Sequence, residues 1–139
     1  MIAVLDASVV LKWFRQEADD ATAKLIQHAI TDGTLMARVP DLIRYEVANV
    51  LVWKGQTGSD DAIEAIEVLE RLPWHVTHPS RQLLTAAITI AARYRASMYD
   101  AIYVALALDA DAPFITADEK LITKLDHPKV VHLRDFKLS

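Results

Sequence analysis

Short apolar runs rich in β-branched residues alternate along this chain with longer segments of helical periodicity. The strand-like runs are residues 2–5, 74–77, 113–116 and 129–133. Helical patterns lie over residues 7–14, 18–31, 41–58, 59–72, 79–96, 99–108 and 117–125. Strands that alternate with helices favour a mostly parallel sheet with helices on both faces, so we predict a three-layer α/β/α domain.

Proline, glycine and serine mark several of the predicted helix boundaries. Pro40 is expected to open the helix that follows it, and Gly55 and Gly58 are expected to close that helix. Ser59 is expected to begin the next one, and the long helix over residues 79–96 is expected to start at its proline.

Size and composition favour a single soluble domain over residues 1–139. The 139 residues are 53% hydrophobic with three glycines, enough for a sizeable core. Cysteine is absent, which excludes disulfides and thiolate metal sites and fits a reducing compartment. The longest uncharged run, residues 82–92, is too short to span a bilayer, and no basic leader precedes the first apolar run. We therefore expect a cytoplasmic protein.

Two acidic residues follow predicted strands. Asp6 comes directly after the run 2–5, and Asp118 lies two residues beyond the run 113–116. Open α/β sheets bind ligands outside the carboxyl ends of their strands, which makes both carboxylates candidates for a functional site. The alternative is that each side chain caps the helix that follows it, with Ser8 suited to the same purpose.

Two further acids interrupt apolar helices. Glu46 shares a helical face with apolar residues four positions before and after it, where a carboxylate needs a cation or becomes protonated. A salt bridge from another element is the simpler explanation. Asp100 begins a segment, residues 99–108, that is otherwise apolar on every face, and its alternative role is a cap or a first-turn acid.

The four carboxylates together indicate a metal site more strongly than any one of them does. Converging anions repel one another, and a divalent cation relieves that repulsion. Mg²⁺ and Mn²⁺ prefer carboxylate oxygens and water, which suits a site of Asp and Glu without Cys. The net charge of −4 argues against a nucleic-acid partner, but bound cations would reverse the local sign.

Four blocks of the sequence resemble, in order and spacing, the motifs of the PIN-domain nucleases, and in particular the VapC-like toxins of prokaryotic VapBC toxin–antitoxin pairs. The blocks are VLDASVVLKWF, PDLIRYEVANVL, YDAIYVALAL and FITADEKL. The resemblance covers nearly the whole chain. It implies a PIN-like fold on a parallel five-stranded sheet, and a Mg²⁺- or Mn²⁺-dependent endoribonuclease that cleaves single-stranded or loop RNA.

Carried over residue by residue, the resemblance implies catalysis and metal binding by Asp6, Glu46, Asp100 and Asp118. Asp6 and Asp118 are the expected direct ligands, whereas Glu46 and Asp100 bind the metal directly or through water. Ser8 and Thr116 are the expected supporting hydroxyls. The resemblance also implies a homodimer and a cognate antitoxin that lays a segment into the active-site cleft, and apolar surface on residues 40–72 would suit both contacts.

Basic residues near these acids are candidates for contacts with RNA phosphates. They are Lys12, Arg15, Arg93 and Arg95, whose alternative role is that of solvated helix ends. Trp13 and Phe14 either stack on bases or fill a core or a partner groove. The five histidines show no ligand-like spacing and are expected to be surface or packing residues.

Two other interpretations stay open at this point. A phosphoacceptor receiver domain is also a small acidic α/β fold that binds Mg²⁺. It has paired acids after its first strand, however, whereas Asp6 stands alone and the run 74–77 ends without an acid. A catalytically inactive binding domain on the same fold would lack a site acid, and none is missing here.

Overall fold

One five-stranded sheet forms the centre of the molecule. The computed structural model describes residues 1–54 and 58–139. The sheet has the order β3-β2-β1-β4-β5, and every pair of neighbouring strands is parallel. Its strands are β1 Ile2–Leu5, β2 Met36–Pro40, β3 His75–Thr77, β4 Phe114–Thr116 and β5 Val130–His132. The sheet confirms the predicted α/β class, and β1 lies in the middle.

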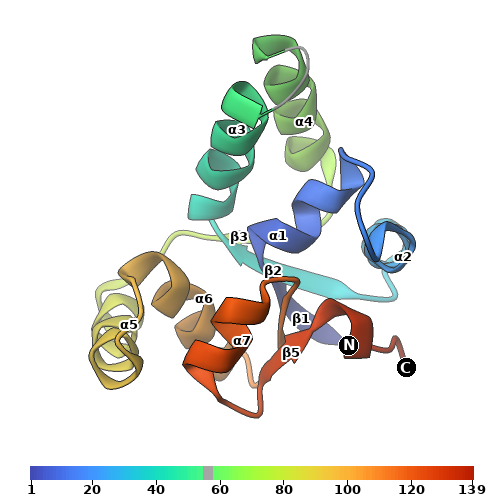
Figure 1. Ribbon diagram of the computed structural model, residues 1–139. Coiled ribbons are helices and arrows are strands. Elements are labelled where there is room, and N and C mark those ends of the chain that lie inside the picture. The colour runs from blue at the N-terminus through green and yellow to red at the C-terminus, as the bar shows by residue number, and fades with distance from the viewer. Residues whose placement is uncertain (55–57) are drawn as a thin grey trace.

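Helices connect the strands and cover both faces of the sheet. Within the described residues they are α1 Ala7–Val10, α2 Asp20–Thr31, α3 Leu42–Lys54, α4 Ser59–Arg71, α5 Arg81–Tyr94, α6 Met98–Asp109 and α7 Glu119–Leu125, with two short 3₁₀ helices at Leu11–Trp13 and Leu133–Asp135. Helices α3 and α4 connect β2 to β3, and α5 and α6 connect β3 to β4 on the other side of the sheet, as right-handed crossovers require. Figure 1 shows these two helix pairs standing apart on either side of β2.

Helix α6 is the most deeply buried helix. All of its residues from Ala101 to Ala107 are buried, because the helix packs on β1, β2 and β4 and is covered by α5. The ring of Tyr103 stacks on that of Phe114 in β4, with centroids 5.3 Å apart. This burial fits the apolar pattern of the sequence and fixes the first turn of the helix, which carries Asp100.

Strand β2 is absent from the four strands that the sequence pattern predicts. Buried Ala37 and Val39 alternate there with more exposed residues, so residues 36–40 do not stand out as an apolar run. The expectation that Pro40 opens a helix is wrong: Pro40 is the last residue of β2, where a missing N–H is tolerated, and α3 begins at Leu42.

Several helix ends also differ from the predicted boundaries. Helix α5 begins at Arg81 instead of Pro79, because the Ser80 hydroxyl accepts a hydrogen bond from the backbone N–H of Leu83 at 3.1 Å. The predicted closure at Gly55 lies outside the described residues. None of the helices within those residues is long and apolar enough to cross a membrane.

Candidate active site

Asp6 directly follows β1 and is almost completely buried, with 8% of its surface exposed. Its side chain makes no capping hydrogen bond to α1, so helix capping does not explain this carboxylate. Its Oδ2 atom instead accepts hydrogen bonds from the hydroxyls of Ser8, at 2.6 Å, and Thr116, at 2.8 Å. Each hydroxyl has one proton to donate, and both protons go to the same carboxylate oxygen.

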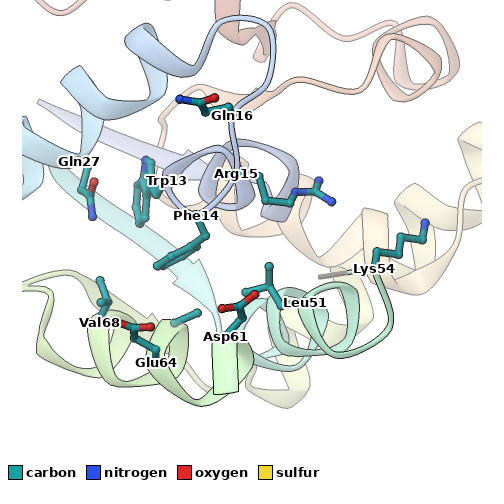
Figure 2. A pocket seen from close by; sticks show the side chains of 11 residues that line it. Trp13, Phe14, Arg15, Gln16, Gln27, Leu51, Lys54, Asp61, Glu64 and Val68 are labelled. Carbon is teal, nitrogen blue, oxygen red and sulfur yellow. The ribbon is translucent and has the colours of Figure 1, made fainter. Parts of the chain in front are cut away.

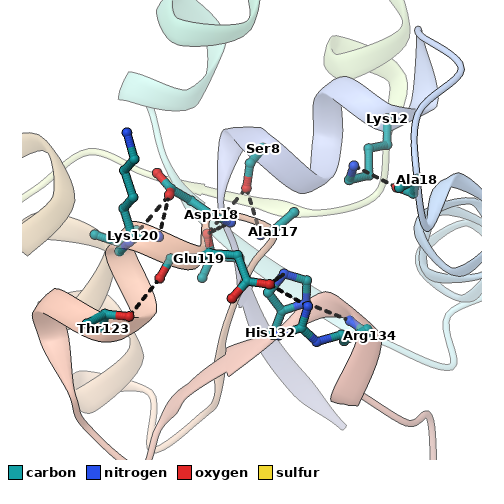
Figure 3. Close-up of polar contacts among 12 residues, drawn as sticks. Ser8, Lys12, Ala18, Ala117, Asp118, Glu119, Lys120, Thr123, His132 and Arg134 are labelled. Carbon is teal, nitrogen blue, oxygen red and sulfur yellow. Dashed lines mark hydrogen bonds and ion pairs between the residues drawn. The ribbon is translucent and has the colours of Figure 1, made fainter.

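The same two hydroxyls connect Asp6 to the end of β4. Ser8 Oγ accepts a hydrogen bond from the backbone N–H of Ala117 at 2.9 Å, and Thr116 Oγ1 accepts one from the N–H of Asp118 at 3.1 Å. Figure 3 shows Ser8 reaching toward Ala117 beside Asp118. Because β1 and β4 are neighbouring parallel strands, their carboxyl ends lie together, and the network brings these predicted residues into one group.

Asp118 caps helix α7. Its Oδ1 atom accepts hydrogen bonds from the backbone N–H groups of Lys120, at 3.0 Å, and Leu121, at 3.3 Å (Figure 3). The capping role considered for this residue is therefore present. Its other oxygen, Oδ2, receives no hydrogen bond from any described residue, and the side chain is exposed. Asp118 can thus cap the helix and hold a ligand at the same time.

Glu46 lies half-buried on α3 and is held by a tyrosine. The Tyr103 hydroxyl donates a hydrogen bond to Glu46 Oε1 at 2.5 Å. Among the described residues no Lys, Arg or His forms an ion pair with Glu46, so the salt bridge considered for it is not found. Burial raises the pKa of Glu46 to about 7; the Tyr103 hydrogen bond opposes this rise, and the charges of Asp6 and Asp100 add to it.

Asp100 lies in the first turn of α6 and is not its cap. Ser97 caps the helix, because its hydroxyl accepts a hydrogen bond from the backbone N–H of Asp100 at 3.1 Å. Burial raises the pKa of the Asp100 carboxyl, hydrogen bonding to Ser97 lowers it, the charge of Asp118 raises it, and the charge of Lys124 lowers it. The pKa of Asp100 therefore depends on the charge of Lys124 on α7 and on the charge of Asp118, which caps that helix.

Electrostatic repulsion links all four predicted acids. Burial raises the pKa of Asp6 against the hydrogen bonds from Ser8 and Thr116, and the charge of Asp100 raises it further. Asp100 also repels Glu46 and is repelled by Asp118. Charge repulsion therefore connects the four carboxylates, with Asp118 connected through Asp100, and we call these four residues the acidic site.

The side chains of the acidic site do not form a closed metal shell as they stand. Within residues 1–54 and 58–139, no three Asp, Glu or His side chains are grouped closely enough to hold a metal ion. The donor chemistry nevertheless fits a hard divalent cation, because every donor is a carboxylate oxygen and Asp118 Oδ2 makes no hydrogen bond with any described residue.

Two of the residues predicted to contact RNA form ion pairs within the protein, and of these Lys12 is buried and Arg15 is partly exposed. Helix α1 ends at Val10, shorter than predicted, and the 3₁₀ turn that follows directs Lys12 inward. The buried Lys12 Nζ donates hydrogen bonds to Glu17 Oε2 at 3.1 Å and to the carbonyl oxygen of Ala18 at 2.7 Å. Figure 3 shows the bond to Ala18. Arg15 pairs with the same Glu17 at 2.5 Å. These contacts close the loop after the 3₁₀ turn.

The other two predicted contacts are exposed at the end of α5. The Arg93 guanidinium lies 5.4 Å from the centroid of the Tyr94 ring, and Arg95 ends the helix with a left-handed φ of 55°. Sequence reasoning missed one cation, Lys124, although its charge acts on Asp100. The sequence feature that could have identified Lys124 is its position four residues after Lys120, on the same face of the helix that Asp118 caps.

A separate ion-pair cluster lies beside Asp118. Glu119 accepts a hydrogen bond from Arg134, and His132 Nε2 lies 3.7 Å from the same carboxylate oxygen (Figure 3). The Arg134 hydrogen bond lowers the pKa of Glu119. His132 is buried, and its Nδ1 accepts a hydrogen bond from the backbone N–H of Arg134. Glu119 is therefore neutralised locally and is not part of the acidic site.

A pocket of about 760 Å³ lies away from the four acids, between the segment after α1 and helices α3 and α4. Figure 2 shows Phe14 pointing into it above Asp61, Glu64 and Leu51. Trp13 at its edge is anchored, because its indole N–H donates to the carbonyl oxygen of Ala23 at 2.8 Å and its ring contacts Trp74. Both aromatics thus pack partly buried against the core, and both also line the pocket.

A family model described as PIN domain matches residues 3–127. The chain belongs to the PIN-domain family. Within this family the protein is VapC-like, because it is 31% identical over 130 residues to "Ribonuclease VapC3" of Pyrobaculum aerophilum, a match that covers 89% of this chain and 95% of the relative.

Solved structures show the same fold. VapC20 of Mycobacterium tuberculosis, described as a Sarcin-Ricin loop cleaving toxin, superposes with a TM-score of 0.70 at 16% identity over 87% of this chain and 93% of that one. A toxin–antitoxin complex from Klebsiella pneumoniae gives 0.67 at 17% identity, covering 94% and 97%. VapBC2 from Rickettsia felis, bound to a promoter DNA fragment, gives 0.69 at 10% identity, covering 95% and 97%. The family match favours the nuclease interpretation over the receiver-domain alternative.

Proposed function

We propose that this PIN-domain protein is a metal-dependent endoribonuclease that hydrolyses phosphodiester bonds in single-stranded or loop RNA. The observation that carries the proposal is the Asp6 carboxylate, which is buried at the carboxyl edge of the sheet, has one oxygen held by two hydroxyls, and repels the carboxylates of Glu46 and Asp100. The likeness to a protein named as a ribonuclease supports the same activity.

Mg²⁺ or Mn²⁺ is the cofactor that we propose for the acidic site. Asp6 and Asp118 would hold it directly, and Glu46 and Asp100 directly or through water. When bound, the ion supplies the charge that polarises the scissile phosphate and lowers the pKa of an attacking water. An all-oxygen donor set without cysteine is typical of these two metals.

The protein's own residues prepare this chemistry. Ser8 and Thr116 donate hydrogen bonds that favour the ionised form of Asp6, against the cost of burying it. Asp118 stays oriented because its other oxygen caps α7. We propose that Arg93 and Arg95 contact RNA phosphates, and that Lys124 adds a positive charge on the other flank of Asp100.

The catalytic assignment is tested by Asp6→Asn and Asp118→Asn. Asparagine keeps the size of both side chains and retains the capping ability of residue 118. We expect each variant to lose RNA cleavage in Mg²⁺ or Mn²⁺ by on the order of 1,000-fold while the fold is retained. EDTA is expected to abolish wild-type cleavage, and added Mn²⁺ to restore it.

Asp111→Asn is the matched control. Asp111 is exposed, pairs with Lys129 at 2.7 Å and has a left-handed φ of 49° that asparagine tolerates. The Asp111→Asn variant should cleave RNA like the wild type. Full activity in Asp6→Asn or Asp118→Asn would refute the assignment and would favour a catalytically inactive binding domain.

We further propose that the protein is the toxin of a toxin–antitoxin pair and that it forms a homodimer. Large apolar side chains are exposed on α3 and α4, including Trp53, which is 78% exposed, Tyr45 and Ile63. Such a surface is typical of protein contacts. The structural likeness to toxin–antitoxin complexes supports the partner class.

The two partner proposals have separate tests. Light scattering of the purified chain should give twice the mass of 15.5 kDa if it is a dimer. A small DNA-binding protein encoded immediately upstream should copurify with the chain and inhibit its RNA cleavage. A monomeric mass at micromolar concentration would contradict the dimer, and undiminished cleavage in the copurified complex would contradict the antitoxin.

A further inference from the structure

Tyr103 is a buried polar residue that the four acidic motifs do not explain. Its surface is 1% exposed, and its ring stacks on Phe114 with an interplanar angle of 16°. Its hydroxyl donates a hydrogen bond to Glu46 Oε1 at 2.5 Å. A phenylalanine would fill the same space, so packing alone does not account for the hydroxyl.

The hydroxyl constrains a flexible acid. The glutamate side chain has three rotatable bonds, and restricting it costs conformational entropy. Glu46 forms no ion pair with any described residue, and the Tyr103 bond is the one hydrogen bond to its carboxylate among those residues. This bond fixes Oε1 and leaves Oε2 free for another ligand.

Tyr103 also connects two separate parts of the acidic site. It lies on α6 three residues after Asp100, so the two side chains share a helical face, whereas Glu46 comes from α3. The stack on Phe114 in turn fixes the ring to β4, two residues before Thr116. A shift of α6 or β4 would therefore move the phenol that holds Glu46.

We propose that Tyr103 is a positioning residue that holds Glu46 in the orientation with which it binds the metal. The inference rests on the proposed metal-dependent activity and deepens it. Groups that hydrogen-bond a metal ligand typically affect metal affinity by 10- to 100-fold, although they never touch the metal.

Tyr103→Phe tests this inference, because it removes the hydroxyl and keeps the ring and its stack. Mn²⁺ affinity of the purified chain, measured by calorimetry or by the EPR signal of free Mn²⁺, is expected to fall by about 10- to 100-fold. The rate constant kcat at subsaturating Mn²⁺ should fall with it, and excess Mn²⁺ should restore most of the rate. Binding of RNA in EDTA should stay at the wild-type level.

Tyr99→Phe is the matched control, because Tyr99 precedes Asp100 on α6 and is 65% exposed. It should bind Mn²⁺ like the wild type. A thermal melt of the metal-free protein checks that Tyr103→Phe is folded. If this variant is too unstable to measure, Phe114→Leu offers a second route: it keeps Glu46 and the phenol but removes the ring on which Tyr103 stacks, and Mn²⁺ affinity should again fall.

A double-mutant cycle separates this inference from the proposed function. If Tyr103 acts through Glu46, Tyr103→Phe should change Mn²⁺ affinity less than twofold in a Glu46→Gln background. Wild-type affinity in Tyr103→Phe, or a full additive loss in the double variant, overturns the inference and leaves the nuclease proposal standing. If instead the wild-type protein cleaved RNA equally well with and without metal, the proposed function would be refuted.

Discussion

Asp6 and Glu46 are two carboxylates of one site that are held in different ways. Asp6 has a short side chain at a strand end and is held by two hydroxyls, one from α1 and one from β4. Glu46 has a longer side chain on a helix and is held by one phenol from another helix. The strand end gives an acid a fixed position through the backbone, whereas the helical acid depends on a distant side chain.

The two carboxylates also differ electrostatically. Two donors on one oxygen favour the ionised form of Asp6, although burial raises its pKa. Glu46 has one donor, and its pKa is raised to about 7 by burial, followed by the charges of Asp6 and Asp100. Near neutral pH without metal, Glu46 is therefore partly protonated, whereas an ordinary glutamate is ionised.

The largest expected effect is on cleavage rate. Asp6→Asn should reduce kcat by on the order of 1,000-fold, and Glu46→Gln by on the order of 100-fold, because Asp6 is the direct ligand in our proposal. Single-turnover cleavage of one RNA in saturating Mn²⁺ measures both. Equal losses would break the distinction between the strand-end acid and the helical acid.

The second largest expected effect is the loss of stability when the Thr116 hydroxyl is removed. Thr116→Val keeps the shape of the side chain but withdraws a hydrogen bond from a buried carboxylate, at a cost of about 2 kcal/mol. Ser8→Ala, at a more open position, should cost about 1 kcal/mol. Urea denaturation in EDTA measures both values. A smaller cost for Thr116→Val than for Ser8→Ala would contradict the buried role of the Thr116 bond.

The pH dependence of stability should identify Glu46. An unfolded glutamate loses its proton near pH 4.5, whereas the pKa of Glu46 in the folded protein is about 7. Between these values the folded state binds more protons than the unfolded state. The stability contributed by the protonated carboxyl is therefore fully present below pH 4.5 and is lost as the pH rises through 7.

After allowance for its partial exposure, we expect this loss to be about 1 kcal/mol in metal-free protein. Glu46→Gln should flatten the slope between pH 4.5 and pH 7. Urea denaturation across this range in EDTA gives the measurement. If the slope persists in Glu46→Gln, another acid, such as Asp6 or Asp100, causes it.

The smallest expected effect comes from the cap of α6. Ser97→Ala removes the hydroxyl that accepts the Asp100 N–H and should destabilise the protein by about 1 kcal/mol. Because α6 carries both Asp100 and Tyr103, Mn²⁺ affinity should fall by a few-fold, whereas Ser80→Ala on α5 should cost similar stability without changing it. Equal Mn²⁺ affinities in the two variants would contradict the link between α6 and Glu46.

The fold could be predicted where one physical signal dominates. The apolar segment of α6 and the strands with acids at their ends are visible as patterns, and they locate the site at the carboxyl edge of the sheet. Strand β2 is not visible, because its exposed Met36 and half-buried Arg38 interrupt the apolar run. Its existence depends on pairing with β1 and β3, which are distant in sequence.

The four acids of the proposed site are visible in the sequence, whereas their surroundings are much less so. The sequence does not reveal that Lys12 faces inward, because this depends on the 3₁₀ turn after α1. Tyr103 was overlooked because it lies in an apolar helix where a tyrosine resembles any other large side chain. Its spacing from Asp100 is the available clue, but the partner on α3 emerges only from the tertiary structure.

The hydrogen bond from Thr116 to Asp6 joins residues 110 positions apart. Asp6 therefore lacks one of its two hydroxyl donors, Thr116, until most of the polypeptide has been synthesised. A truncated or half-folded chain that lacks β4 would carry Asp6 without this donor and without Asp118. If the protein cleaves RNA, its active site is therefore complete only after β4 has been synthesised and has joined the sheet. Nuclease activity would then appear late in the synthesis and folding of the chain.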